Sequence, residues 1–359
     1  MKRMVCFGVL ALTVMIQASP STQGTEKGLV PVDAVTGILE AFQTHDVVAL
    51  PDAHGNAESH AFRLALIRDP RFAATVDDIV IELGNARYQD LADLYVSGGD
   101  VPITDLRKVW QDTTISTAGN NYEMTEELLQ TVRGLNAMRR GSRKLRVLLG
   151  DPPIDWQRVQ SRADFQGYFA LRDSYPAAQI VSEVIAKGRK ALVTYGALHF
   201  QRLNILTNYS MEAWQAQTIL SLLEAATPTR VYTIWEADLQ TLGDQARSCP
   251  SQQLATVSGT SFGDADFAIF VPAMAAQRSS IVNGKFEPVP ASQFRRISVE
   301  DQLDAVLYLG PRTPSRPSYE VPLPLCREPG FVEEQSRRIG LSAPRVEADR
   351  LKDYCAKSK

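Results

Sequence analysis

Short apolar runs alternate along the chain with segments whose apolar residues recur at helical spacing. Five runs are continuous rather than alternating, which is typical of strands buried on both faces of a parallel sheet. They are Val47–Leu50, Asp78–Leu83, Leu145–Leu149, Ala191–Tyr195 and Val231–Trp235. Two later runs, Phe267–Val271 and Ala305–Leu309, are predicted to extend the sheet.

Helices are predicted between these strands. The segments with helical spacing are Val32–Phe42, Ser59–Arg68, Arg87–Val96, Ala177–Lys187, Trp214–Ala226 and a terminal helix near Val346–Tyr354. Residues 104–140 are predicted to be helical in two pieces. Alternating strands and helices indicate an α/β fold with a mostly parallel central sheet and helices on both faces.

The same pattern predicts the organisation of the domain. No strand pattern lies between Leu83 and Lys144, so we expect a helical cap inserted at about residues 87–142. The α/β domain is expected to span residues 31–312. A C-terminal extension, residues 313–359, is expected to pack on it.

The first residues differ from the rest of the chain. Lys2 and Arg3 precede the apolar run Met4–Ile16, and the small residue Ala18 follows. This pattern predicts a secretory signal peptide at residues 1–18, because the run is too short to cross a bilayer; a retained anchor is the alternative. Residues 19–30 are expected to form a flexible leader. The mature chain should therefore be exported, periplasmic or extracellular, with no membrane span.

Charge and cysteine usage narrow the class of protein. The 359 residues carry a net charge of −3, so no basic surface indicates a nucleic-acid partner. Cys249, Cys326 and Cys355 are too widely spaced for a zinc site, but an exported chain permits a disulfide. The pairs Cys249–Cys326 and Cys326–Cys355 are equally compatible with the sequence.

Ionisable side chains follow all five strands. In order along the chain they are Asp52 and His54, Glu82, Asp151, His199 and Glu236. Ligand sites in open α/β sheets lie beyond the carboxyl ends of the strands, so these groups should meet at one edge. Polar residues after strands are often only loop residues or helix caps. Two of the chain's four histidines at equivalent positions favour a site.

These residue types suit two kinds of chemistry. Asp52, His54, Glu82 and His199 could bind Zn, Mn or Fe and activate water. Without a metal, His54 or His199 could act as a general base, with Glu82 orienting the imidazole. An outer group is expected around them, comprising Glu58, His60, Arg87 and Asp151. A serine triad is less attractive because the chain has no G-x-S-x-G motif.

The motifs resemble a superfamily that joins the ChaN-like haem-uptake proteins, the Tiki metalloproteases and the erythromycin esterases. The likeness lies in Pro51-Asp52-Ala53-His54, in Ile79-Val80-Ile81-Glu82 and in Gly196-Ala197-Leu198-His199. His54-Gly55 matches the esterase version, and His54, Asn56 and His60 match the ChaN-like one. Pro51-Asp52 departs from the family's Gly-Glu, which leaves the metal geometry and the proton-transfer role open.

A second resemblance is to the calcineurin-like metallophosphoesterases. Asp52-Ala53-His54-Gly55-Asn56 resembles their D-x-H-G-N opening, and Gly150-Asp151 their second motif. The later histidine motifs of that family are missing.

We therefore expect an exported hydrolase of ester or peptide bonds, with a small-molecule or peptide substrate and with or without a divalent metal. The first alternative is a non-enzymatic binder of haem or metal, with His54 and His60 as haem ligands. The minor alternative is a metallophosphoesterase. A scaffold that has lost its activity is also compatible with the Pro51-Asp52 departure.

Overall fold

A central sheet of eight strands organises the chain in the computed structural model, which describes residues 27–115, 122–139, 143–202, 217–227, 231–243, 251–270, 279–282, 285–288, 296–317, 319–343 and 345–357. The strand order is β1-β7-β10-β6-β2-β5-β3-β4. The strands are β1 (Pro31–Asp33), β2 (Val47–Pro51), β3 (Asp78–Asn85), β4 (Arg146–Asp151), β5 (Ala191–Tyr195), β6 (Tyr232–Glu236), β7 (Gln253–Thr256) and β10 (Ala305–Tyr308).

Neighbouring strands from β10 to β4 pair in parallel, and β7 and β1 continue the sheet in antiparallel orientation. This arrangement confirms the predicted mostly parallel α/β fold. A separate antiparallel pair, β8 (Ser279–Val282) with β9 (Lys285–Pro288), lies outside the central sheet.

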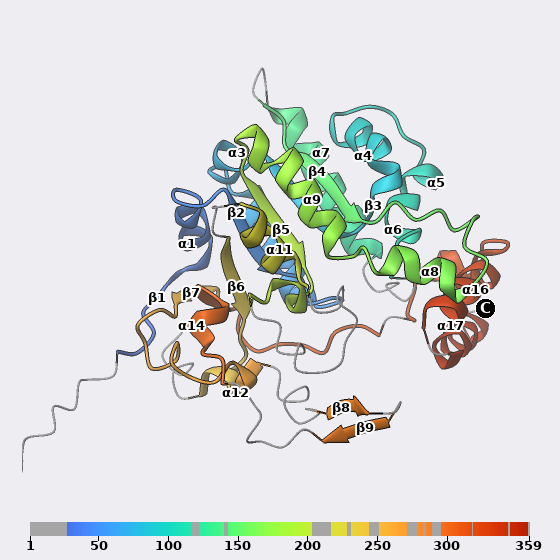
Figure 1. Cartoon of the computed structure of the whole chain (residues 1–359). Coiled ribbons are helices and arrows are strands. Elements are labelled where there is room, and N and C mark those ends of the chain that lie inside the picture. The colour runs from blue at the N-terminus through green and yellow to red at the C-terminus, as the bar shows by residue number, and fades with distance from the viewer. Residues whose placement is uncertain are drawn as a thin grey trace, which may run out of the picture.

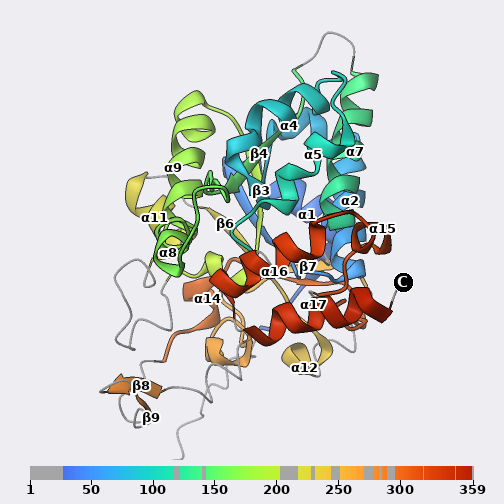
Figure 2. The ribbon, with the colours of Figure 1, turned by 90° about the vertical axis from the view of Figure 1, so that its right-hand side faces the viewer.

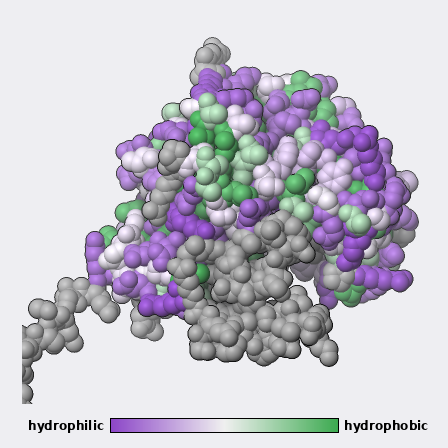
Figure 3. Space-filling model, viewed as in Figure 1, coloured by the Kyte–Doolittle hydropathy of each residue, from purple (hydrophilic) through white to green (hydrophobic). Residues whose placement is uncertain are grey.

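Helices cover both faces of the sheet (Figures 1 and 2). One face carries α9 (Ser174–Glu183) and α11 (Ile219–Ala226). The other carries α1 (Ala34–Ala41), α2 (Ala57–Arg68), α4 (Gln89–Val96) and α7 (Tyr122–Met138). Hydrophobic residues are visible over α9 and α11 in Figure 3, and most of the surrounding described surface is hydrophilic.

The continuous apolar runs of the sequence are explained by this two-sided cover. In β2, Val48 and Leu50 belong to the hydrophobic cluster under α1 and α2, whereas Val47 and Ala49 belong to the cluster under α9 and α11. Successive side chains in a strand point to opposite faces. A strand between two helical layers therefore needs an apolar residue at every position.

The region expected to be a cap contributes α4, α5 (Ile103–Leu106), α6 (Lys108–Gln111) and α7, with a short 3-10 turn, η1 (Ala86–Tyr88), before them. Helix α4 packs on α7 and on β4, and α7 packs on α2. The described part of this region therefore lies against one face of the sheet and reaches the site only through Thr114, Ile115 and the first turns of α7.

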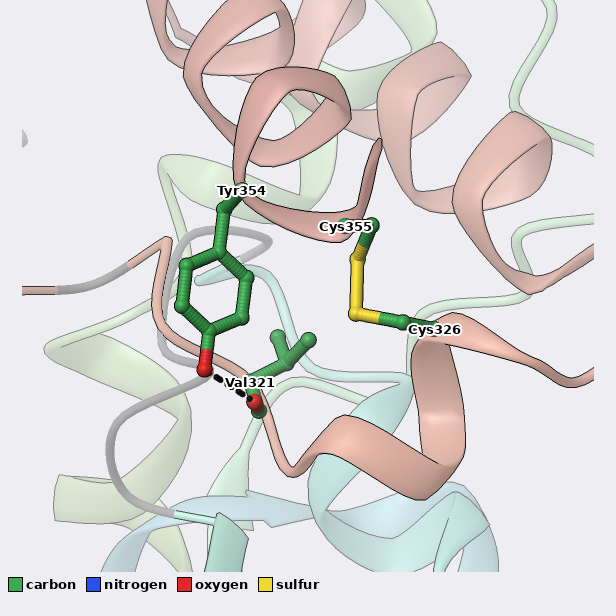
Figure 4. The surroundings of a disulfide bond; sticks show 4 residues. All are labelled: Val321, Cys326, Tyr354 and Cys355. Atoms are coloured by element: carbon green, nitrogen blue, oxygen red, sulfur yellow. Dashed lines mark hydrogen bonds between the residues drawn. A yellow bond between two sulfur atoms is a disulfide. The ribbon is translucent and has the colours of Figure 1, made fainter. Parts of the chain in front are cut away.

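The C-terminal segment forms α15 (Leu323–Cys326), α16 (Phe331–Ser342) and α17 (Arg345–Lys357), and α16 packs on α8 (Arg162–Phe169). A disulfide joins Cys326 to Cys355, which resolves the pairing that the sequence left open (Figure 4). Beside it the Tyr354 hydroxyl donates a hydrogen bond of 3.2 Å to the Val321 carbonyl. Cys249 lies outside the described residues.

One predicted strand is wrong. Phe267–Phe270 forms a 3-10 helix, and its residues pack around Trp235 and Phe262 rather than pairing with the sheet. A short apolar run does not distinguish a strand from a buried helical turn. The predicted signal peptide lies outside the described residues, as does Trp214, the expected start of the helix that begins at Ile219.

None of the helices in the described part of the chain has the length and apolar character that a membrane crossing requires.

Candidate functional site

The carboxyl ends of β2, β5 and β3 carry the centre of the site. Because β5 lies between β2 and β3, the ends of these three strands bring His54 after β2, His199 after β5 and Glu82 in β3 close together. The four residues expected to form the inner set are therefore brought together from three adjacent strands. Asp52 lies within ion-pairing distance of His54, and Glu82 lies within ion-pairing distance of both histidines.

Glu82 bridges the two histidines. Its Oε2 lies 3.3 Å from Nε2 of His54, and its Oε1 lies 3.5 Å from Nε2 of His199. The Gly196 backbone N–H donates to Oε2 at 2.7 Å. The Glu82 side chain is 2% exposed, so these donors replace the water that a carboxylate otherwise requires. Burial raises the pKa of Glu82, but the His54 and His199 charges outweigh it and hold that pKa well below its usual range.

A tight turn after β2 presents His54. Gly55 has a φ of 71°, a conformation that glycine adopts without strain, and the Asn56 side chain then caps α2 by accepting from the Ser59 backbone N–H. Asp52 Oδ2 lies 3.3 Å from Nδ1 of His54. A carboxylate on Nδ1 fixes the tautomer and the ring orientation.

His199 has a carboxylate of its own. Its Nδ1 lies 2.8 Å from Oδ1 of Asp173, the residue before α9. The same oxygen accepts from the Ile219 backbone N–H at 2.9 Å, so α9 and α11 together fix Asp173. Each histidine therefore has its own carboxylate at Nδ1, and both histidines contact Glu82 through Nε2.

Two arginines complete the network. Arg63 Nη1 of α2 lies 2.7 Å from Asp52 Oδ1. Arg172, in the link between α8 and α9, donates from Nη2 to Glu82 Oε1, and this nitrogen lies 3.4 Å from Nε2 of His199. The sequence did not indicate Arg63, Arg172 or Asp173, because none of them follows a strand.

The carboxylates make both imidazoles more basic. Burial lowers the pKa of His54, but the Glu82 charge and the hydrogen bond to Asp52 outweigh it and raise the pKa to about 10. Burial likewise lowers the pKa of His199, and Glu82 and Asp173 raise it to about 9. Without a ligand, both rings carry a proton at neutral pH.

A cavity of about 370 Å³ opens above this network. His54, Glu82, Arg172 and His199 line its polar part. Side chains of α8, of η4 (Ala197–Phe200) and of the segment that follows α6 line its apolar part, namely Phe165, Phe169, Leu198 and Ile115. The end of α16 closes one side with Ser342 and Ala343. His54 is the most exposed of the four polar groups, with 34% of its side chain accessible.

The residues expected in the outer group lie apart from this cavity. Glu58 accepts from the Thr313 hydroxyl at 2.8 Å. His60 Nε2 lies 3.0 Å from Oε2 of Glu127, on the far side of Asp52, where a cavity of only about 30 Å³ is found. Arg87 pairs with Asp155 at 3.2 Å, and Arg172 is the arginine that contacts Glu82.

Asp151, the fourth member of the outer group, is buried beside the network. Its Oδ2 accepts from the Thr114 backbone N–H at 2.7 Å, and its Oδ1 accepts from the Thr114 hydroxyl. Burial raises the pKa of Asp151 to about 7. Glu236, the last of the acids that follow strands, does not line the cavity. It accepts a hydrogen bond from Ser59 and pairs with Arg312.

The expected metal ligands do not fit a metal ion as they are arranged here. Among the described residues no three His, Cys, Asp or Glu side chains are placed to hold one. Both ring nitrogens of His54 face carboxylates, and the guanidinium of Arg172 stands between Glu82 and His199, where an ion would need to bind. A fixed cation repels a divalent ion from that position.

The arrangement does not favour a haem site either. His54 and His60 lie on different cavities, and His60 is already paired with Glu127. What the described residues do provide is two imidazoles, each oriented by a carboxylate, at the base of a cavity of ligand size.

No family model and no curated protein matches this sequence. Solved structures do resemble the fold. A structural-genomics target described as a succinoglycan biosynthesis protein aligns with a TM-score of 0.53 at 10% identity, over 80% of this chain and 96% of its own. A structural-genomics protein from Bacillus cereus aligns with a TM-score of 0.47 at 12% identity over the same shares, 80% and 96%. At these identities the likeness concerns the fold alone.

Proposed function

We propose that this chain is a hydrolase of ester or amide bonds that transfers protons through His54 and His199. The observation that carries the proposal is the position of Glu82, which is 3.3 Å from Nε2 of one histidine and 3.5 Å from Nε2 of the other. Hydrolysis needs one group to take a proton from water and another to give a proton to the leaving group. Two imidazoles linked by one carboxylate suit that pair of tasks.

His54 is the better candidate for the base. It is the more exposed of the two rings, and Asp52 directs its Nδ1 so that Nε2 is the atom that exchanges a proton. In the first step a water oxygen forms a bond to the substrate carbonyl carbon, and the water proton passes to Nε2 of His54. The carbonyl oxygen becomes an oxyanion, and Arg172, always charged, stabilises it.

His199 is the better candidate for the acid. In the second step the bond from carbon to the leaving oxygen or nitrogen breaks, and Nε2 of His199 supplies the proton. His54 then holds one proton more than at the start of the cycle and His199 one fewer. Glu82, within 3.5 Å of both rings, gives a short path for the proton to return. The catalytic set is thus His54, Glu82, His199 and Arg172, and no step requires a metal.

The disulfide supports the proposal that the chain is exported. A bond between Cys326 and Cys355 is maintained most readily outside the reducing cytoplasm, which supports our expectation of an exported protein.

The test is hydrolysis of 4-nitrophenyl esters and 4-nitroanilides by the purified chain, before and after treatment with a chelator. We expect turnover that the chelator leaves unchanged and that falls at least about 100-fold in His54→Gln and in His199→Gln. His45→Gln is the matched control, because His45 packs on Tyr232 away from the cavity and should keep the full rate. Absence of turnover, or full rates in both site variants, would contradict the proposal.

A further inference from the structure

The cavity has two chemically distinct walls, and the relation between them restricts the ligand. We propose that the site accepts an ester or amide whose acyl group is compact and apolar, of about the size of an aromatic ring, and releases the matching carboxylate. Assignment of the reaction rests on the proposed function, whereas assignment of the bound group rests only on the walls of the cavity.

The apolar wall stands on a rigid base. Phe165 is buried in a small cluster with Ile154, Trp156 and Val159, and its ring stacks on Trp156 with centroids 5.8 Å apart. Phe169, one turn further along α8, lies 5.5 Å from Phe165 and lines the cavity with it. Side chains held in this way lose little freedom when an apolar group packs against them.

Arg172 lies at the junction of the two walls. Its guanidinium carbon is 5.2 Å from the centre of the Phe169 ring, and it also contacts Glu82. The contacts to Glu82 and His199 both use Nη2, so Nε and Nη1 remain available to a ligand as far as the described residues go. A guanidinium binds carboxylate oxygens in a bidentate manner.

The position of Arg172 determines which part of the substrate packs against the apolar wall. An oxygen held by Arg172 lies next to Phe169 because the guanidinium and the ring are neighbours. The leaving group must lie beside Nε2 of His199, which protonates it, so the acyl group is the one that packs on Phe169 and Phe165. The leaving group extends past His199 and Leu198, and 46% of the Leu198 surface is exposed.

The volume supports a compact ligand. At about 370 Å³ the cavity is at the lower end of the range for small-molecule sites, roughly 300–1,000 Å³. The end of α16 limits it on one side. A ring-sized acyl group fits these limits better than a folded or extended polypeptide.

The test measures binding of the product-like carboxylates phenylacetate and acetate by calorimetric or NMR titration. We expect the wild-type chain to bind phenylacetate at least about tenfold more tightly than acetate, since the ring removes its apolar surface from water. Phe169→Ala should reduce that ratio to about threefold or less without changing the affinity for acetate. Phe169→Leu, which keeps an apolar side chain, should retain most of the ratio.

Arg172→Gln is expected to weaken both carboxylates by a similar factor and to leave their ratio unchanged. Circular dichroism of each variant checks that it is folded. Equal affinities for the two carboxylates in the wild-type chain, or a ratio unaffected by Phe169→Ala, would overturn the inference even if esters are hydrolysed. The expected ratio without any ester turnover would support the assigned acyl pocket and refute the proposed hydrolase.

Discussion

Arg63 Nη1 lies 2.7 Å from Asp52 Oδ1, and the two side chains are almost entirely buried where α2 packs behind β2. Burial alone would raise the pKa of Asp52, but Arg63 and His54 outweigh it and hold that pKa far below its usual range. Asp52 therefore stays ionised and keeps its contact with Nδ1 of His54. Helix α2 thus supplies the arginine that holds the acid after Pro51.

Removing one partner of this buried ion pair should lower the free energy of unfolding. In Arg63→Met the carboxylate of Asp52 loses its buried cation, and we expect the free energy of unfolding to fall by about 3–5 kcal/mol. The double variant Asp52→Asn/Arg63→Met should recover part of that loss, since no buried charge then remains unpaired. Urea denaturation followed by tryptophan fluorescence measures both. The exposed Arg68→Met on the same helix is the control, with an expected change below about 1 kcal/mol. A small effect of Arg63→Met would show that water reaches Asp52.

The rate of hydrolysis should peak at alkaline pH. His54 must lose its proton to act as a base, and its raised pKa of about 10 makes kcat/KM increase with pH above neutrality. His199 must keep its proton to act as an acid, and its pKa of about 9 makes the rate fall at higher pH. The pH–rate profile should therefore be bell-shaped. Because Glu82 couples the two rings, the two apparent pKa values of this profile belong to the pair of histidines and not to either one alone. Initial rates from pH 6 to 11 should therefore show a maximum near pH 9–10.

Asp52→Asn should move the rising limb of that profile to lower pH. The hydrogen bond that His54 donates to Asp52 raises the pKa of His54, so its loss lowers that pKa and makes the neutral base available at lower pH. The maximum rate should fall as well, since the ring is less firmly oriented. A profile unchanged in Asp52→Asn would argue against His54 as the base.

Stability should depend on the protonation of Asp151. Burial raises the pKa of Asp151 from 3.8 to about 7, so the folded chain retains a proton that the unfolded chain has lost. The contribution of Asp151 to the free energy of unfolding should therefore decrease as pH rises from about 4 to about 7 and level off above that.

Asp151→Asn carries no titrating group at this position and should lack that contribution. Relative to the wild-type chain, its stability should rise by about 1.4 kcal/mol per pH unit between pH 4 and 7. Asp90→Asn, at an exposed position of α4, serves as the control and should give a curve parallel to the wild type. If the stability of Asp151→Asn also ran parallel to that of the wild type with pH, the proton retained on folding would not be on Asp151.

The disulfide should contribute measurably to stability. Cys326 and Cys355 close a loop with a sequence separation of 29, and both lie in the main hydrophobic cluster. We expect Cys326→Ala/Cys355→Ala to lower the free energy of unfolding by about 2–4 kcal/mol. Cys249→Ala, which leaves the bond intact, is the matched control. Equal stability of the double variant and the wild type would mean that the helices are held by their packing alone.

The strands and the centre of the site could be predicted from the sequence because both depend on local patterns. Continuous apolar runs identified β2, β3, β4, β5 and β6, and residues just after β2 and β5, with Glu82 in β3, supplied the central residues. Such runs arise wherever a strand is covered on both faces, as β2 is by two separate hydrophobic clusters. The carboxyl ends of adjacent parallel strands then meet without further information.

The partners of those residues could not be predicted in the same way. Arg172 and Asp173 lie between two helices, and only the docking of α9 and α11 on the sheet brings them to His199. Arg63 was expected within an amphipathic helix, where a single arginine is usually solvated. Arg87 was expected in the outer group of the site, but η1 directs it to Asp155. The antiparallel strands β1 and β7 were missed because they are only 3 and 4 residues long, too short for an apolar pattern to stand out.

The position of β5 between β2 and β3 also determines at which stage of synthesis or refolding the site can form. His54 and Glu82 belong to strands that are not neighbours, and the strand that joins them comes more than a hundred residues after Glu82 in the chain. Pairing over such separations delays folding because the intervening chain must first be closed into a loop. A nascent chain that has not yet presented residues 191–199 contains most of the acids and one histidine of the site but has no surface on which to assemble them. Activity should therefore arise late and all at once, during synthesis and during refolding alike.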